Sequence, residues 1–468
     1  MGVGVSNWRL AQAVSSLGQL GVVSGTALDS VFVRRLADGD QGGHMRRGLD
    51  AFPFPEMARR IWQDYFVPGG KPSGSPYPNL PMHQQVQSRI RIELCIVANF
   101  VEVFLAREGH NNAVGINFLE KVQLPHLPSL YGAMLAGVGY VLMGAGIPLQ
   151  VPGVLDALAA QHPAAYRLSV TGAPQNLETV MHFDPAVYAE GPLPELTRPK
   201  FLAVVSSNTL AATMLRRASG RVDGLIIEGP TAGGHNAPPR GKLQLTEDGE
   251  PVYGDRDAVN LADLRALGVP FWLAGGYGRP GKLHEALKEG AAGIQAGTAF
   301  AFSRESGLRD DLKSKIVEQA TTGTAAIFTD PLVSPTGFPF KVVQLDGTNS
   351  EDAAYQARQA ICDLGYLREL YVMPDGKIGY RCAAEPATNY VAKGGDREET
   401  VGRKCLCNGL LANIGLAQVR KDETVELPLV TAGDDLNIIA EFLAPGATSY
   451  SAADVVRMLM ETPQHTDA

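Results

Sequence analysis

Long apolar runs are missing from this sequence, and so is the layout of a secretory leader. No stretch reaches the roughly 18 uninterrupted apolar residues that a membrane span needs, and the N-terminus lacks a basic segment followed by an apolar one. We therefore expect a cytoplasmic protein without a membrane partner.

An excess of positive charge is missing as well. The 468 residues carry a formal net charge of -8, which disfavours a nucleic-acid partner. Cysteine is scarce, and the odd total of five suits a reducing compartment. Glycine is abundant instead, and 52 glycines in a chain with 45% hydrophobic residues favour many strand-to-helix turns around a large core.

The fingerprint G-x-G-x-x-G does not follow the first apolar run, which disfavours an open doubly wound sheet. Eight short apolar runs are present, most of them ending in small or polar residues and separated by helical spacing. We predict an α/β fold of the (β/α)8 TIM-barrel type. The predicted strands are residues 20–24, 113–117, 140–143, 166–170, 201–205, 224–227, 271–274 and 293–296.

Two regions depart from this rhythm. Residues 40–85 contain the loop PGGKPSGSPYPNLP, which predicts an insertion after the first strand that could act as a lid. Beyond about residue 322 the alternation of strands and helices is lost. We predict a barrel over residues 1–322 and an appended α+β region over residues 323–468 that packs on it. Exposed barrel helices would also allow a homodimer.

Residues 270–303 hold two strand-to-helix units in tandem. One apolar run stops at Gly275-Gly276 and the next at Gly297-Thr298. Glycines at strand ends let backbone N–H groups approach a phosphate without a Cβ in the way, and a barrel's phosphate site belongs after strands seven and eight. The alternative is that these glycines form only tight turns and helix caps.

The loop after the sixth predicted strand carries the most informative residues. Gly233-Gly234 would let the backbone pass close to a flat ligand, and His235 would then project into the mouth of the barrel. Histidine can move a proton or donate a hydrogen bond near neutral pH, although a structural histidine is the alternative. Glu228 ends a buried strand, so it must face a ligand or find a hydrogen-bond partner. We favour contact with a ligand.

These segments resemble the nitronate monooxygenase family, formerly called 2-nitropropane dioxygenases, and the related FMN-dependent enoyl-acyl-carrier-protein reductases. The resemblance rests on the Gly-Gly-His loop, LAGGYG at 273–278, IQAGTAF at 294–300, residues 114–117 and residues 144–146, and it covers about residues 15–320. It implies an FMN-binding barrel oxidoreductase with His235 as the catalytic residue in the substrate pocket. The residues implied at the cofactor are Ser24, Gly25, Thr26, Asn117, Gly144, Glu228, Gly233, Gly234, Gly275, Gly276, Gln295, Gly297 and Thr298.

The resemblance implies oxidation of alkyl nitronates by O2 to a carbonyl compound and nitrite. Family members resemble one another in a histidine on the helix after strand five, where this chain has Ala211-Ala212-Thr213. Oxidation of neutral nitroalkanes is therefore disfavoured, whereas an anionic nitronate needs no such base. Two alternatives are an FMN- and NAD(P)H-dependent enoyl-thioester reductase of fatty-acid or polyketide type, with His235 near the substrate carbonyl, and a flavin-binding barrel without turnover.

Four cysteines near the C-terminus raise the question of a metal. Cys362, Cys382 and Cys405 are separated by gaps of 20 and 23 positions, and Cys407 follows directly, so the C-x2-C pairs of common zinc modules are missing. We favour buried free thiols and predict no metal site. A metal, if held, would be structural and remote from the flavin.

Overall fold

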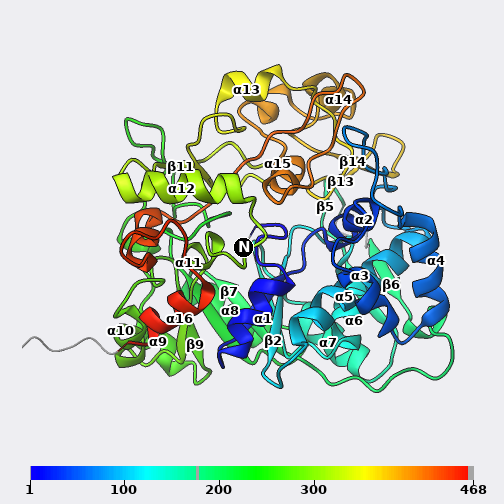
Figure 1. Cartoon of the computed structure of the whole chain (residues 1–468), viewed down its shortest axis with the longest axis horizontal. Coiled ribbons are helices and arrows are strands. Elements are labelled where there is room, and N and C mark those ends of the chain that lie inside the picture. Colours follow the sequence, from blue (N-terminus) through cyan, green and yellow to red (C-terminus); the bar gives the residue numbers. More distant parts are fainter. Residues whose placement is uncertain (1, 175–178, 462–468) are drawn as a thin grey trace, which may run out of the picture.

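The computed structural model describes residues 2–174 and 179–461, and its centre is a parallel β-sheet with helices around it (Figure 1). Seven strands form this sheet in the order β1-β2-β3-β7-β8-β9-β10, and every neighbouring pair is parallel. Their bounds are β1 Gly21–Ser24, β2 Val114–Leu119, β3 Tyr140–Gly144, β7 Lys200–Val205, β8 Gly224–Glu228, β9 Phe271–Ala274 and β10 Gly293–Gln295.

Helices connect and cover these strands. Among them, α5 is the longest, with 19 residues, and α6 packs closely against it. Glycine at position 132 of α6 permits this close approach, because a Cβ there would come within 2.1 Å of the Ile96 carbonyl oxygen. The helices of the first 301 residues are α1 Trp8–Ser16, α2 Leu28–Ala37, α3 His44–Asp50, α4 Pro55–Tyr65, α5 Arg89–Arg107, α6 His126–Leu135, α7 Val151–Ala159, α8 Asn208–Arg217, α9 Leu261–Ala266, α10 Lys282–Lys288 and α11 Thr298–Ala301, with short 3-10 turns η1 Pro185–Val187 and η2 Asp255–Asp257.

Seven of the eight predicted strands are confirmed, and the fourth is wrong. The predicted run 166–170 falls on β4 (Ala164–Arg167), which pairs antiparallel with β6 (Val180–Phe183), while β3 pairs directly with β7. Alternate residues of β4 are exposed, as in a two-stranded ribbon at a surface, whereas a central parallel strand is buried on both faces.

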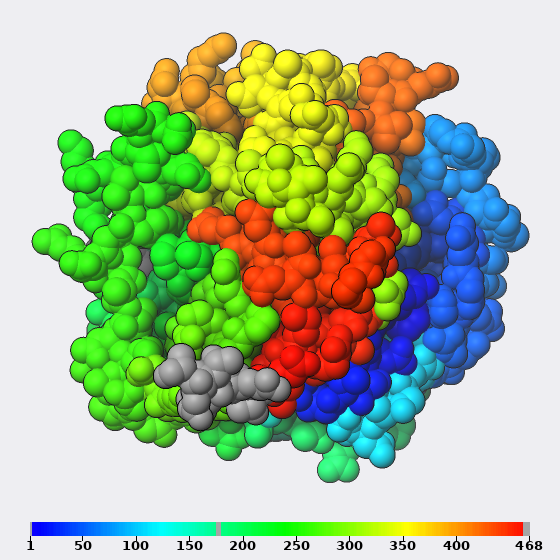
Figure 2. Space-filling view, turned by 60° about the vertical axis from the view of Figure 1, so that its left-hand side comes forward, coloured from blue at the N-terminus to red at the C-terminus, as the bar shows by residue number. Residues whose placement is uncertain are grey.

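The sheet is curled but not closed into the predicted barrel. Across the described residues, no pairing joins β1 to β10. Helix α16 (Ala452–Met460) contacts α1, which packs beside β1, and α10, which packs beside β10, so it lies across this opening. Figure 2 shows the same arrangement, with the red C-terminal segment seated between the blue N-terminal helix and green segments of the second half.

The region after residue 322 forms an upper layer in Figure 1 and also returns to the sheet. Its strand β11 pairs with β12, and its strand β13 pairs antiparallel with β14 and parallel with β5. The division at residue 322 stays a prediction. Helix α12 (Asp310–Thr322) precedes this region, and β5 (Val170–Thr171) joins its sheet from the first part of the chain. The elements of the region are β11 Ile327–Asp330, β12 Phe340–Val343, α13 Asp352–Ala357, β13 Glu369–Val372, β14 Ile378–Arg381, α14 Ala387–Ala392, η3 Arg397–Thr400, α15 Leu406–Asn413 and η4 Leu436–Phe442.

Residues 40–85 fold onto the helical face. Helices α3 and α4 pack against α5 and against each other, and the residues that line the two cavities described below include none from this stretch. The prediction of a lid therefore remains untested. No helix in the described part of the chain combines the length and the apolarity needed to cross a bilayer.

Candidate active site

Two adjoining cavities lie at the carboxyl ends of the parallel strands, where open and barrel-like α/β sheets bind ligands. Their volumes are ≈ 110 Å³ and ≈ 560 Å³, and both are lined by Glu228, Gly233, Gly234 and Gln295. The smaller cavity also gathers Thr26, Asn117, Gly144 and His235, and the larger one Gly275, Gly276, Gly297 and Thr298. Twelve of the fourteen predicted site residues therefore lie around one continuous space.

The glycine turns after β9 and β10 form a cradle of backbone N–H groups in the larger cavity. Gly275 and Gly276 have φ angles of +83° and +74°, and a Cβ on Gly275 would lie 3.0 Å from the Gly229 carbonyl oxygen. Within the described residues, the N–H groups of Gly275, Gly276, Gly297 and Thr298 donate to no protein acceptor. Such a cradle suits an anionic ligand.

Two buried polar atoms near the ends of β1 and β2 bear on what the site can bind. Asn117 Oδ1 and Ser24 Oγ are buried, and neither has a hydrogen-bond partner among the described residues. Asn117 lines the smaller cavity. Ser24 lines neither cavity, and Gly25 lines a separate small one, where a Cβ would lie 2.4 Å from the Phe118 ring. Unpaired buried polar atoms are uncommon in native proteins, so Asn117 Oδ1 is a candidate to accept a hydrogen bond from a ligand in the cavity.

His235 is fixed by the C-terminal region. Its Nε2 shares a 2.7 Å hydrogen bond with Ser334 Oγ, and its ring meets Phe340 edge-on with centroids 4.9 Å apart. An antiparallel bridge to Phe340 holds its backbone, because Lys341 N donates to Gly234 O and Asn236 N donates to Pro339 O. Burial lowers the pKa of His235 to about 4, so the imidazole is neutral near pH 7 and acts as a hydrogen-bond donor or acceptor.

Glu228 ends β8 and lines both cavities, and its carboxyl group makes no hydrogen bond to any of the described residues. Burial raises its pKa to about 7. A carboxyl group with such a pKa can hold or release a proton near neutral pH, as general acid–base catalysis requires.

Sequence reasoning missed the partners that come from the last third of the chain. Ser334, Phe340 and Thr431 hold the Gly-Gly-His loop, since Thr431 Oγ1 also accepts a 2.8 Å hydrogen bond from Gly234 N. Tyr366 lines the smaller cavity. The proline-rich stretch around Ser334 was visible in the sequence, but no local pattern ties it to a histidine about 100 positions earlier.

A family model of nitronate monooxygenase matches residues 170–331. The resemblance predicted from the sequence is confirmed. The segment that matches this oxidoreductase family includes the Gly-Gly-His loop and both glycine turns.

Curated relatives are more distant. A (3aS,4S,5R,7aS)-5-hydroxy-7a-methyl-1-oxo-octahydro-1H-indene-4-carboxyl-CoA dehydrogenase of Mycobacterium tuberculosis is 27% identical over 175 residues, which are 36% of this chain and 44% of the relative. A probable nitronate monooxygenase of Bacillus subtilis is 31% identical over 142 residues, or 30% of this chain and 39% of the relative. The matches thus span less than half the length of each relative.

Solved structures are similar over most of the chain, but only weakly. The structure of FabK from Thermotoga maritima is similar with a TM-score of 0.48 at 15% identity, over 97% of this chain and 88% of that one. A nitroalkane oxidase from Streptomyces ansochromogenes has a TM-score of 0.41 at 17% identity and covers 98% and 92%. These likenesses are too weak to assign an activity.

Proposed function

We propose that this chain is an FMN-dependent oxidoreductase that reduces the carbon–carbon double bond of an enoyl thioester. The observation that carries the proposal is a single neutral histidine, His235, beside a cavity that adjoins the glycine cradle. A neutral imidazole that donates a hydrogen bond suits a carbonyl oxygen on which negative charge develops. It is a weak base, which disfavours removal of a proton from carbon.

The residues present fit FMN. The free N–H groups of Gly275, Gly276, Gly297 and Thr298 would hold the phosphate, and Asn117 and Gln295 would face the ring system. No lysine or arginine appears among the described residues that line the larger cavity, so backbone groups would carry the phosphate contact. When bound, the flavin would supply the hydride that NAD(P)H provides to it.

The protein's own groups account for the rest of the reaction. If Ser334 donates to Nε2, the imidazole proton lies on Nδ1, which can donate to the thioester carbonyl oxygen. As a hydride reaches the β-carbon, that oxygen gains charge and the bond strengthens. Glu228, with a pKa of about 7, would give a proton to the α-carbon. The product is the saturated thioester.

The names of two relatives support this class of substrate. The relatives from Mycobacterium tuberculosis and Rhodococcus jostii are by name carboxyl-CoA dehydrogenases, so their substrate is a CoA thioester and their reaction removes hydrogen. We take from them the thioester as the substrate class of the proposed reaction.

Oxidation of alkyl nitronates with O2 is the second candidate, favoured by the family model and by the Bacillus subtilis relative. Helix α8 carries no histidine, and an anionic nitronate needs none. His235 would then bind the nitro oxygens. Cytoplasmic location, O2 as co-substrate and a homodimer stay predictions.

Anaerobic stopped-flow absorbance separates the candidates. The FMN-loaded protein is mixed separately with NADPH, with NADH and with propyl-2-nitronate, and the reduced protein is then mixed with crotonyl-CoA. The proposal expects bleaching by a nicotinamide and recovery of the flavin spectrum with crotonyl-CoA. Bleaching by the nitronate alone would support the second candidate. Without any spectral change, the chain would be a flavin-binding barrel without turnover.

His235→Ala should slow the recovery phase by about 10²- to 10³-fold, the usual loss when one oxyanion donor is removed. His182→Ala is the matched control, because His182 is an exposed histidine on β6 that lines neither cavity. Equal rates for the two variants would remove His235 from the reaction.

A further inference from the structure

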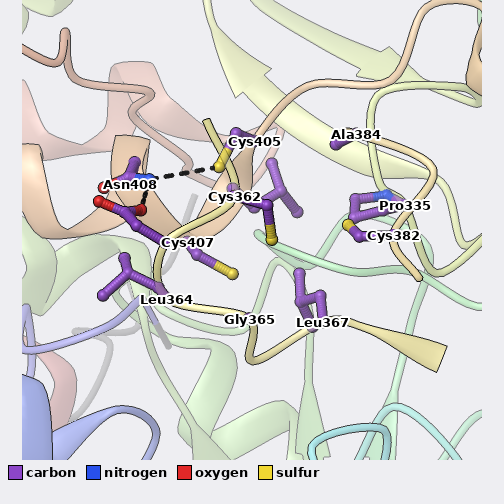
Figure 3. Close-up of a pocket in the computed structure, with 12 residues that line it drawn as sticks. Pro335, Cys362, Leu364, Gly365, Leu367, Cys382, Ala384, Cys405, Cys407 and Asn408 are labelled. Carbon is purple, nitrogen blue, oxygen red and sulfur yellow. Dashed lines mark hydrogen bonds between the residues drawn. The ribbon is translucent and has the colours of Figure 1, made fainter. Parts of the chain in front are cut away.

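Four cysteines from three distant segments surround one small cavity (Figure 3). Cys362 follows α13, Cys382 directly follows β14, and Cys405 and Cys407 lie at the start of α15. In Figure 3 the Cys362 sulfur lies between those of the other three. All four thiols are free, and the fifth cysteine, Cys95, is buried elsewhere.

The four thiols are shielded from solvent, since Cys382 is buried and Cys362, Cys405 and Cys407 are half-buried. The thiolate is the form that binds a metal, so binding at such a shielded cluster is coupled to loss of the thiol protons.

Polar and charged side chains surround the cluster. The Asn408 side chain donates to Cys405 Sγ at 3.6 Å and to Asp363 Oδ1 at 2.8 Å. Arg368 lies within electrostatic range of Cys362 and Cys382, and Arg358 within that of Cys405. These cations would offset the charge of a four-thiolate site.

The size of the space limits what it can hold. The cavity has a volume of ≈ 10 Å³, which corresponds to one water-sized sphere and leaves no room for an iron–sulfur cluster. An all-thiolate donor set selects zinc among single divalent ions, at Zn–S distances of about 2.3 Å.

We propose that Cys362, Cys382, Cys405 and Cys407 bind one structural zinc ion in a tetrahedral four-thiolate site. In the described structure, no three of these sulfur atoms lie within 4.8 Å of one another. A tetrahedral zinc site requires sulfur separations of about 3.8 Å, so binding draws the three segments inward and releases the thiol protons.

Contrary to the sequence-based expectation, this cluster is not remote from the proposed active site. Leu367, Leu406 and Cys407 line both the cysteine cavity and the smaller cavity beside His235. The residues before Cys405 also hold the loop of Ser334, because Arg403 Nη1 donates to Ser334 O at 2.6 Å and Lys404 N donates to Val333 O. The zinc ion would therefore fix one wall of the pocket and the partner of its histidine.

Elemental analysis of the purified full chain tests this directly. We expect about one zinc per chain without added metal. After exchange for Co²⁺, the wild-type chain should show the intense sulfur-to-cobalt charge-transfer band and the visible d–d bands of a tetrahedral thiolate site. Cys382→Ser and Cys407→Ser should each lose most of the metal, whereas the matched control Cys95→Ser should keep it, because Cys95 lies outside the cluster.

Several results would overturn the inference: a wild-type chain without zinc that also binds no Co²⁺, a disulfide between Cys362 and Cys382 found by peptide mapping, or iron and labile sulfide in place of zinc. If the serine variants fail to fold, the metal content and cobalt spectrum of the wild-type chain still decide the question. Because these readouts do not depend on turnover, they are independent of the proposed reaction.

Discussion

The hydrogen bond between Ser334 and His235 permits a quantitative prediction. Ser334→Ala removes the 2.7 Å bond to Nε2 but leaves the backbone carbonyl of residue 334, which accepts from Arg403, in place. A neutral hydrogen bond contributes about 0.5–1.5 kcal/mol. If that energy serves to orient the imidazole, the rate of thioester reduction falls roughly 2- to 10-fold.

A double-mutant cycle separates orientation from a direct role. His235→Ala should lower the rate about 10²- to 10³-fold, and adding Ser334→Ala should then change nothing further, which gives a coupling energy of about 1 kcal/mol. The assay is the single-turnover rate at which crotonyl-CoA reoxidises the reduced flavin, with thermal unfolding measured for each variant.

Thr336→Val is the matched control for this cycle. Thr336 Oγ1 bonds to the same Ser334 hydroxyl at 2.8 Å, so valine perturbs the serine but keeps its contact with the histidine. We expect less than a twofold change in rate, since the contact with His235 is retained. If Ser334→Ala slows the wild-type protein and the His235→Ala variant by the same factor, the two effects are additive and Ser334 does not act through His235.

Three further predictions concern buried groups and the glycine cradle. Burial raises the pKa of Glu228 from 4.5 to about 7, so the flavin-free protein should lose up to about 3 kcal/mol of stability as pH rises through this window. Urea unfolding measured from pH 4 to 8 should show this loss, and Glu228→Gln should flatten it; an unchanged profile in the variant would refute the role of Glu228. Gly275→Ala should weaken FMN binding in a fluorescence titration, because φ at this position is positive and the new Cβ would lie 3.0 Å from the Gly229 carbonyl oxygen. Gly278→Ala is the control and should bind FMN normally, since its Cβ would meet only Ala296 at 3.4 Å and Ala299 at 3.5 Å. Equal affinities of the two variants would contradict the phosphate cradle. Burial alone would raise the pKa of Asp29, but Arg91, His83 and Tyr366 hold it well below its usual range, so the stability that the ionised carboxylate contributes should be lost as pH falls below about 4. At neutral pH, Asp29→Asn should lower the free energy of unfolding by about 3–5 kcal/mol, because Arg91 is left buried without its carboxylate. A decrease below about 1 kcal/mol in thermal unfolding would refute this prediction.

Most of the fold could be predicted because its signals are local. A strand such as Phe271–Ala274 is a short apolar run, and the glycines after it mark the turn by their conformational freedom. The run 166–170 looked alike, but only its pairing with 180–183 reveals a surface ribbon. Whether β1 pairs with β10 to close the sheet depends on two segments about 270 positions apart in the chain. The periodicity of the sequence carries no information about such a pairing, so the opening could not be predicted.

The predicted site shows the same division. Strand ends and glycine turns place Asn117, Gln295 and Gly276 around the cavities, as the strand order implies. Phe340, Tyr366 and Cys407 of the C-terminal region also line the smaller cavity. No spacing rule links those residues to the sheet. The four cysteines stand out in the sequence, but their spacing disfavours a metal site because it lacks short pairs, and only the fold places them around one cavity.

The return of residues 431–433 to the glycine loops has a consequence for biosynthesis. Thr431 holds Gly234, Gly433 N donates to Thr298 Oγ1 at 2.8 Å, and a Cβ on Gly233 would lie 2.7 Å from the Ala432 carbonyl carbon. A ribosome has therefore made every strand of the sheet well before the residues that brace the cofactor cradle emerge. Since chains begin to fold as they are synthesised, the nascent sheet forms with these loops unbraced, and stable retention of the proposed cofactor would be one of the last events in the maturation of the protein.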